Sequence, residues 1–161
     1  MKLDKKRKLK RKTNYNKRLK LLKSGFIRLV IRKTNKYIIL QLIESKGARD
    51  VVIDSVNTRE LLKYGFPEEF KGSLKSIPAA YLGGYLLGKK SKIKSKIILD
   101  IGLIPNTKGS KIYSALKGVL DSGLNLSSGK DIFPSEEKIN GEKSKINQDI
   151  LNKIKSKIEN G

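Results

Sequence analysis

The loop Thr107-Lys108-Gly109-Ser110-Lys111 combines small and basic residues between two apolar stretches. The run Ile97–Ile101 before it is typical of a strand that is covered on both faces. After it, Ser110 can cap a helix whose apolar residues recur at helical spacing over Ile112–Val119. A helix N-terminus presents unpaired backbone N–H groups, and the two lysines of the loop add positive charge. The loop is therefore predicted to bind an anion such as a phosphate group.

Three interpretations of this loop are open. A nucleotide-hydrolysing phosphate loop requires the order G-x-x-x-x-G-K-[ST], but Lys108 precedes Gly109 here, and Gly102 stands too far upstream. The loop could also be a plain strand-to-helix connection with basic residues on the surface. The third interpretation, a nucleic-acid phosphate held at the helix start, is the one that the rest of the chain favours.

Two alternating stretches, Phe26–Lys33 and Lys36–Glu44, predict a β-hairpin with Thr34-Asn35 as its two-residue turn. One face of this hairpin is apolar. The opposite face and its rim carry residues that stack on bases or pair with phosphates: Arg28, Arg32, Lys33, Thr34, Asn35, Lys36, Tyr37 and Gln41. This face is predicted to bind RNA, with an ordinary solvated sheet face as the alternative.

The segment Met1–Ser24 is a basic arm that contains 12 Lys or Arg residues and one acid, Asp4. Runs such as Lys5-Lys6-Arg7-Lys8 and Lys10-Arg11-Lys12 have no apolar face to bury, so we expect them to be disordered until they bind a polyanion. A solvated tail or a localisation signal would have the same composition. The residues expected to contact RNA are Lys5, Lys6, Arg7, Lys8, Lys10, Arg11, Lys12, Tyr15, Lys17, Arg18 and Lys20.

The composition of the 161-residue chain also favours a polyanionic partner. It has 37 Lys and Arg against 15 Asp and Glu, a formal net charge of +22, and neither cysteine nor histidine. Disulfides, thiolate nucleophiles, zinc fingers and histidine bases are thus excluded. We find no bilayer-length apolar run and no signal-peptide pattern, so we expect a cytoplasmic protein.

The predicted elements follow the order β-β-β-α-β-α over residues 25–125. A third strand, Val51–Val56, precedes a capping box at Asn57 and Glu60. The helix Ser76–Gly88 contains Gly83-Gly84, a pair that is tolerated mid-helix when another element packs closely. We expect an α/β domain with a mixed sheet, in which the fourth strand runs parallel to the first. In the extension 126–161, isoleucines recur every four residues from Ile146 to Ile158 and predict an amphipathic docking helix.

Several of these motifs together resemble the L-eighteen family of large-subunit ribosomal proteins, and the resemblance covers about Arg18 to Lys143. The segments that carry it are Leu29–Ile38, Ile77–Leu82, Leu86–Lys90, Leu99–Leu103, Thr107–Lys111 and Ala115–Gly118. The Ala-Ala-Tyr motif and the Pro-Ser-Glu-Glu segment are similar to archaeal or eukaryotic members. Since the long carboxy-terminal extension of eukaryotic members is missing, the archaeal type is expected.

This resemblance implies a ribonuclease-H-like domain that binds 5S rRNA and touches the large rRNA through the basic arm. It also implies neighbouring large-subunit proteins as partners, and neither catalysis nor a cofactor. Tyr81, in the Ala-Ala-Tyr motif, is assigned to the RNA interface. Tyr37 occupies a place often held by histidine in the family, and the tail beyond Lys145 has no counterpart there.

Two rival functions are weaker. A metal-dependent nuclease would need several carboxylates around two metal ions, but Asp50, Asp54, Asp100 and Asp121 are not placed together by the strand alternation. A membrane-surface protein would carry Trp or Phe on a basic amphipathic helix, whereas this chain has no Trp. The sequence therefore predicts an RNA-binding protein with no enzymatic activity, no metal site and no small-molecule substrate.

Overall fold

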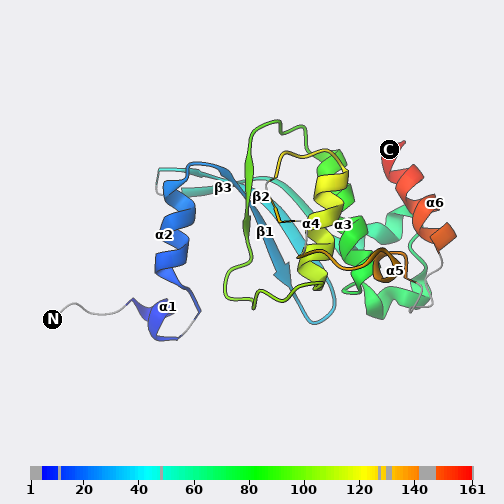
Figure 1. Ribbon diagram of the computed structural model, residues 1–161, viewed down its shortest axis with the longest axis horizontal. Helices are drawn as coiled ribbons and strands as arrows, with labels where there is room; N and C mark the ends of the chain where they lie inside the picture. Colours follow the sequence, from blue (N-terminus) through cyan, green and yellow to red (C-terminus); the bar gives the residue numbers. More distant parts are fainter. Residues whose placement is uncertain are drawn as a thin grey trace.

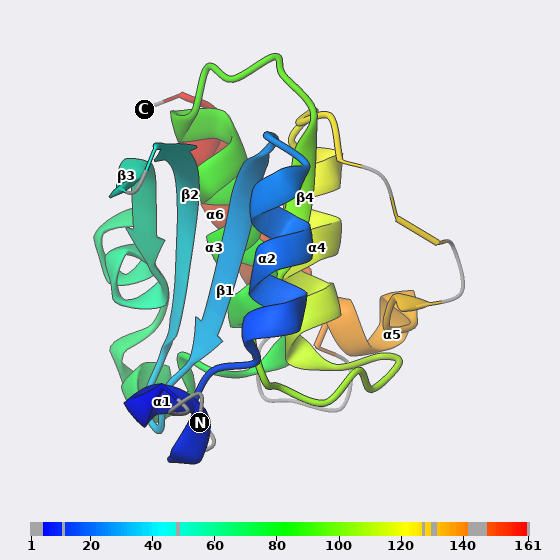
Figure 2. The same cartoon turned by 90° about the vertical axis from the view of Figure 1, so that its left-hand side faces the viewer.

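The computed structural model describes residues 5–10, 12–47, 49–126, 128–129, 132–141 and 148–160. Its centre is one four-stranded sheet (Figure 1), in which the strands follow the spatial order β3-β2-β1-β4 (Figure 2). The strands are β1 (Ile27–Lys33), β2 (Ile38–Lys46), β3 (Arg49–Asn57) and β4 (Ile97–Asp100). β1 and β2 pair antiparallel, as do β2 and β3, whereas β4 pairs parallel with β1. The predicted α/β class and mixed sheet are confirmed.

The β1–β2 turn lies one residue later than the sequence predicted. Lys33 pairs with Ile38, and the Thr34 backbone N–H donates to the Tyr37 carbonyl at 2.9 Å. The Thr34 hydroxyl also donates to that carbonyl at 2.7 Å and accepts from the Tyr37 N–H at 3.0 Å. The turn residues are therefore Asn35 and Lys36, because Thr34 closes the hairpin instead of forming its tip.

One face of the sheet forms the hydrophobic core, as the alternation predicted. Leu29 and Ile31 of β1 and Ile38, Leu40 and Leu42 of β2 have no exposed surface. They face the helices α3 (Ile77–Lys90) and α4 (Lys111–Asp121), which follow β3 and β4 in the chain. Between β3 and α3 lie two 3₁₀ helices, η1 (Thr58–Tyr64) and η2 (Glu68–Ser73).

The helix starts follow the predicted caps. The Asn57 and Glu60 capping box is present before η1, and the Ser76 hydroxyl accepts from the Ala79 N–H before α3. Ser110 occupies the N-cap position of α4 without a side-chain hydrogen bond. The caps of η1 and α3 therefore satisfy backbone donors that the helix itself leaves unpaired.

The two core helices α3 and α4 approach each other through glycine. A Cβ atom at Gly84 would lie 2.0 Å from the Ala115 carbonyl oxygen, and one at Gly118 would lie 2.1 Å from the Tyr81 carbonyl oxygen. At Gly83 a Cβ atom would lie 2.8 Å from Cγ2 of Thr58. The prediction of close packing at the glycine pair is confirmed, since no larger residue fits these contacts.

The opposite face of the sheet is covered by part of the basic arm. The helix α2 (Tyr15–Lys23) lies across β1 and β4, on the side away from α3 and α4 (Figure 2). The Asn14 side chain caps α2 by accepting from the Lys17 N–H at 3.0 Å, and a short helix α1 (Lys6–Leu9) precedes it. The expectation of disorder concerned the basic runs, and most of the first run lies in the helix Lys6–Leu9 here; residues 1–4 and Arg11 lie outside the described residues.

The C-terminal extension contains α5 (Glu136–Ile139) and α6 (Gln148–Glu159). α6 buries Leu151, Ile154 and Ile158 and contacts α3 and η1. The predicted isoleucine repeat thus lies on a helix that packs on the domain, except that Ile146 lies outside the described residues. None of the helices in the described ranges is long and apolar enough to cross a membrane.

Candidate nucleic-acid interface

A chain of ion pairs connects the basic arm to the sheet. Arg18 of α2 and Arg28 of β1 both bind the Asp50 carboxylate, at 2.8 and 2.7 Å. Arg28 continues to the Asp100 carboxylate at 3.3 Å and is itself only 2% exposed. The Ser45 hydroxyl accepts from Arg28 at 3.0 Å, so the buried guanidinium has partners on three strands. A buried charge of this kind is tolerated only when it is paired.

The carboxylate of Asp50 is held in its charged form. Burial alone would raise its pKa, but hydrogen bonds from Ser45, Arg18 and Arg28, together with the charge of Arg28, outweigh burial and lower the pKa to about 2. Asp50 therefore stays ionised at neutral pH and connects α2 to β3.

Arg28 does not belong to an exposed RNA platform. The sequence correctly placed it on the face opposite the core, but α2 covers that face and the ion pairs occupy the guanidinium. The predicted role of Arg28 as an RNA contact is therefore replaced by a structural role. Its neighbour Arg32, with a side chain 42% exposed, stays accessible on the same strand.

Arg32 lies against the loop that follows β4. Its Nη1 donates to the Asp100 carbonyl at 2.7 Å, and its Nη2 donates to the Asp100 carboxylate at 3.2 Å. Gly102 has a positive φ of 63°, and a Cβ atom there would lie 3.2 Å from Cζ of Arg32. The glycine thus permits both the turn and the close approach of the guanidinium.

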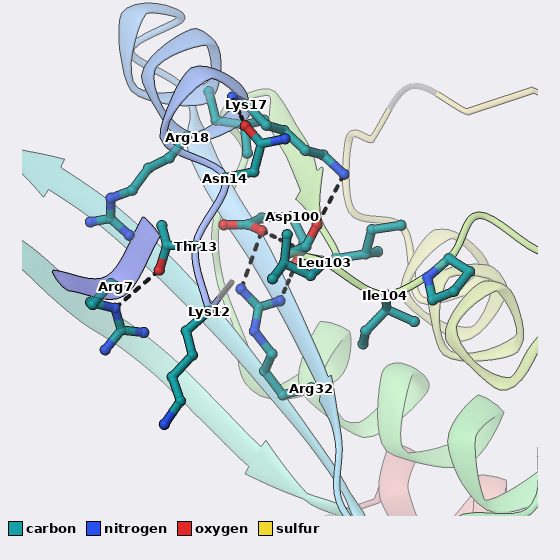
Figure 3. Close-up of a pocket in the computed structure, with 14 residues that line it drawn as sticks. Arg7, Lys12, Thr13, Asn14, Lys17, Arg18, Arg32, Asp100, Leu103 and Ile104 are labelled. Atoms are coloured by element: carbon teal, nitrogen blue, oxygen red, sulfur yellow. Dashed lines mark hydrogen bonds and ion pairs between the residues drawn. The ribbon is translucent and has the colours of Figure 1, made fainter. Parts of the chain in front are cut away.

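A cavity of about 560 Å³ opens beside Arg32, between the arm and the loop 101–105. Its lining includes Arg7, Lys12, Lys17 and Arg18 from the arm (Figure 3). Of the residues that the structure describes, Asp100 is the only acid that lines it, and this acid already pairs with two arginines. The cavity is consequently strongly positive and suited to an anionic ligand.

A second basic cluster lies where the hairpin, the segment before α3 and the start of α4 meet. Burial lowers the pKa of Lys111, and the nearby charges of Lys33 and Lys75 lower it further. Among the described residues, no carboxylate forms an ion pair with these three lysines. Three neighbouring unpaired cations favour a bound polyanion, because a phosphate would relieve their mutual repulsion.

We call Arg32, Lys33, Lys75, Lys108 and Lys111 the basic edge. Its location follows from topology: β1 and β4 are parallel, so their carboxyl ends meet at the same edge of the sheet. Arg32 and Lys33 end β1, while Lys108 lies in the connection from β4 to α4 and Lys111 is the first residue of α4. Lys75 had no sequence signal, because only folding brings it near the other lysines.

The loop that the sequence singled out differs in detail from a phosphate-binding loop. The Gly109 N–H donates to the Ile132 carbonyl at 2.9 Å, and the Ser110 N–H donates to the Thr107 carbonyl at 3.3 Å. These two groups are already paired, and Ser110 Oγ is buried without a hydrogen-bond partner in the described structure. The side chains of Lys108 and Lys111, rather than those amides, are left as the donors for an anion.

Tyr81 is not presented to an external ligand. It is 5% exposed, its hydroxyl donates to Asp121 at 2.7 Å, and Nζ of Lys155 lies 4.6 Å from its ring centroid. Burial, followed by the hydrogen bond and charge of Asp121, raises the pKa of Tyr81 above its ordinary value. We therefore correct its assignment: Tyr81 helps to hold α6 and α4 on α3.

The remaining predicted contacts differ in accessibility. Most lie exposed on the arm, the hairpin tip or the loop: Lys5, Lys6, Arg7, Lys8, Lys10, Lys12, Lys17, Arg18, Lys20, Lys33, Asn35, Lys36 and Lys108. A second group is half-buried: Tyr15, Arg32, Thr34, Tyr37, Gln41, Gly109, Ser110 and Lys111. Arg11 lies outside the described residues.

The carboxylates do not support the nuclease alternative. Asp50 and Asp100 pair with arginines, and Asp121 accepts from Tyr81. In the part of the chain that the structure describes, no group of three or more acidic side chains is arranged to hold a metal ion.

Comparison with known proteins agrees with the basic interface. The sequence profile of the family described as ribosomal large subunit proteins 60S L5, and 50S L18 matches residues 1–97. The chain is also 50% identical, over 133 residues, to the large ribosomal subunit protein uL18 of Korarchaeum cryptofilum. That alignment covers 81% of this chain and 66% of the archaeal protein. The chain therefore belongs to the family of large-subunit ribosomal proteins that comprises 60S L5 and 50S L18.

Proposed function

We propose that the protein binds 5S rRNA and attaches it to the large rRNA of the large ribosomal subunit, without catalysis. The observation that carries this proposal is the basic edge, where Lys33, Lys75 and Lys111 gather and no acid of the described residues forms an ion pair with them. Such a surface is unfavourable in the free protein and becomes favourable against RNA phosphates. The domain would be of the ribonuclease-H-like type that the family resemblance implies.

Two regions divide the proposed contacts. The basic edge and the hairpin tip would bind 5S rRNA, through Arg32, Lys33, Thr34, Asn35, Lys36, Tyr37, Gln41, Lys75, Lys108, Gly109, Ser110 and Lys111. The arm would reach the large rRNA, through Lys5, Lys6, Arg7, Lys8, Lys10, Arg11, Lys12, Tyr15, Lys17, Arg18 and Lys20. Neighbouring large-subunit proteins would cover other surfaces. The ion pair between Arg18 and Asp50 supports this division, because it fixes the direction in which the arm leaves the domain.

Recovery of the bound RNA tests the proposal. The protein would be isolated with its RNA from native cells after ultraviolet crosslinking, and the retained RNA would be sequenced. We expect 5S rRNA to be enriched, with crosslinks on the basic edge, and large-subunit rRNA to crosslink to the arm. Enrichment of unrelated RNAs in proportion to their abundance would contradict the proposal, because it would show that the protein binds RNA through its net charge without preference for 5S rRNA.

A further inference from the structure

The cavity beside Arg32 has walls of two chemical kinds. On the arm side, Arg7 and Lys12 supply positive charge, while Lys17 donates to the Gly102 carbonyl at 3.2 Å. On the loop side the wall is apolar and consists of Leu103, Ile104 and Pro105. In Figure 3, Arg7 and Lys12 lie on one side of Arg32, and Leu103 and Ile104 lie on the other.

The apolar wall is unusual for a site that only binds phosphate. Leu103 is 53% exposed, although the loop around it is fixed by the Gly102 N–H, which donates to the Asp100 carboxylate at 2.8 Å. A phosphate ion would need the cations but would leave the leucine in water. A ligand with an anionic part and a flat apolar part would use both walls.

The planar guanidinium group of Arg32 forms a third wall of the cavity. This group is held by hydrogen bonds to the Ile31 carbonyl at 2.9 Å and to both the carbonyl and the carboxylate of Asp100. A guanidinium fixed in this way can stack on a nucleobase with little loss of side-chain freedom. The cavity volume of about 560 Å³ lies within the range of about 300–1,000 Å³ that small ligands occupy.

We propose that this cavity receives one unstacked nucleotide of the bound RNA. Its base would lie between the Arg32 guanidinium and Leu103, and its phosphate would face Arg7 and Lys12. The cavity lies where the two proposed RNA-binding regions meet, so residues of both regions would contact this one nucleotide. This inference rests on the proposed RNA-binding function and adds to it a contact that distinguishes a base from the backbone alone. Leu103, Ile104 and Pro105, which carry no charge and no RNA-binding pattern, become part of the interface.

The test compares two oligomers of the same length and charge: an oligoadenylate, and an oligomer in which every nucleotide lacks its base. The full chain should bind the oligoadenylate about fivefold or more tightly, because stacking of one base on a protein side chain contributes this much. Leu103→Ser should lower the ratio of the two affinities by about threefold or more. The matched control is Val52→Ser on β3, since Val52 is similarly exposed at 48% but lies outside the cavity.

A further variant tests the contribution of the basic wall separately from that of the apolar wall. Lys12→Gln should weaken binding of both oligomers equally, because Lys12 is expected to contact phosphate. An affinity ratio near one in the wild-type chain would overturn the inference, and so would equal effects of Leu103→Ser and Val52→Ser. Binding of 5S rRNA is measured separately on the same samples. If the chain binds 5S rRNA no better than other RNAs, the proposed function is contradicted. The ratio of the affinities for the two oligomers tests the nucleotide pocket independently of that result.

Discussion

Arg18 of α2 and Asp50 of β3 form an ion pair 2.8 Å long, and the same carboxylate binds the buried Arg28 at 2.7 Å. One acid thus neutralises a guanidinium that the fold has buried and also fixes the helix of the basic arm. The stability of the domain and the direction of the arm are therefore coupled through Asp50.

The first prediction concerns the stability of the domain at acidic pH. The folded-state pKa of Asp50, about 2, lies below its ordinary value of 3.8, so its contribution to stability is present above pH 4. This contribution should be lost as the pH falls from about 4 to about 2. We expect about 1 kcal/mol, less than the pKa shift alone would give, because the carboxylate is partly exposed and solvent screens it. Urea unfolding at several pH values measures it; Asp50→Asn should flatten the curve, and an unchanged curve would contradict the role of Asp50.

The second prediction tests the contact between α3 and α4. Gly84→Ala places a methyl group 2.0 Å from the Ala115 carbonyl oxygen, so the free energy of unfolding should fall by about 1–3 kcal/mol. Gly72→Ala is the control, because a Cβ atom there meets nothing within 4 Å. Chemical denaturation compares the two variants. Equal free energies of unfolding for Gly84→Ala and Gly72→Ala would show that α3 and α4 can move apart without loss of stability.

The third prediction concerns the salt dependence of RNA binding by the arm. Four exposed arm lysines, Lys6, Lys10, Lys12 and Lys20, would be replaced together by Gln. If all four contact phosphates, the slope of log affinity against log salt should decrease in magnitude by about 3. Filter binding over a range of salt concentrations gives the slope.

The control for the arm removes the same charge elsewhere. Four exposed lysines from other parts of the chain serve for this: Lys63, Lys71, Lys138 and Lys153. Their replacement by Gln should change the slope much less than the arm variant does. Identical slopes for the two variants would mean that net charge, rather than the position of the arm, determines binding.

The fourth prediction concerns Lys75, the member of the basic edge that the sequence did not indicate. Lys75→Gln removes a positive charge near Lys111, so the pKa of Lys111 should rise toward its ordinary value. Side-chain NMR titration of the lysine ammonium groups follows this change. The variant should also bind RNA more weakly, whereas an unaltered Lys111 titration would show that the two lysines do not interact.

The fifth prediction concerns the attachment of α6. Burial and then the hydrogen bond to Glu159 raise the pKa of Tyr85 to about 12, so this contact stabilises the fold below about pH 10 and is lost as the pH rises toward 12. At neutral pH, Tyr85→Phe should cost about 1 kcal/mol and accelerate hydrogen exchange in α6. Exchange rates in α2 provide the internal control. Unchanged protection of α6 would show that the Tyr85 hydroxyl does not contribute to its attachment.

The sequence predicted the parts of the fold that depend on periodicity. Alternation placed Leu29 and Ile31 on the buried face, and the apolar run at Ile97 gave a strand parallel to β1. It misassigned Arg28 because alternation tells which face a side chain occupies, and not whether another segment covers that face. The ion pairs that hold α2 there join residues 18, 28, 50 and 100, which are far apart in the chain.

The sequence predicted the positive charge of the candidate site, but only part of its geometry. The loop at Lys108 was identified correctly as the start of a helix, but the Gly109 N–H proved to be paired with the Ile132 carbonyl, a contact between distant segments. Tyr81 was misassigned because α6 packs over it, and no local pattern shows which face a tail will cover. No local pattern indicates the proposed contacts Lys75 and Leu103 either, because only folding brings them beside the other residues of the basic edge and of the cavity.

The most direct test of the account is a competition between 5S rRNA and an RNA of the same length and composition with a shuffled sequence. The full chain should prefer 5S rRNA, and Lys111→Glu should reduce its affinity for 5S rRNA by about tenfold or more. Lys63→Glu, an equal change in charge at an exposed lysine outside the basic edge, is the control. Lys117 is unsuitable as a control because it lies 3.7 Å from Glu136 in an ion pair. Equal binding of both RNAs by the wild-type chain, or equal losses from Lys111→Glu and Lys63→Glu with intact folds, would contradict a specific 5S rRNA interface at the basic edge.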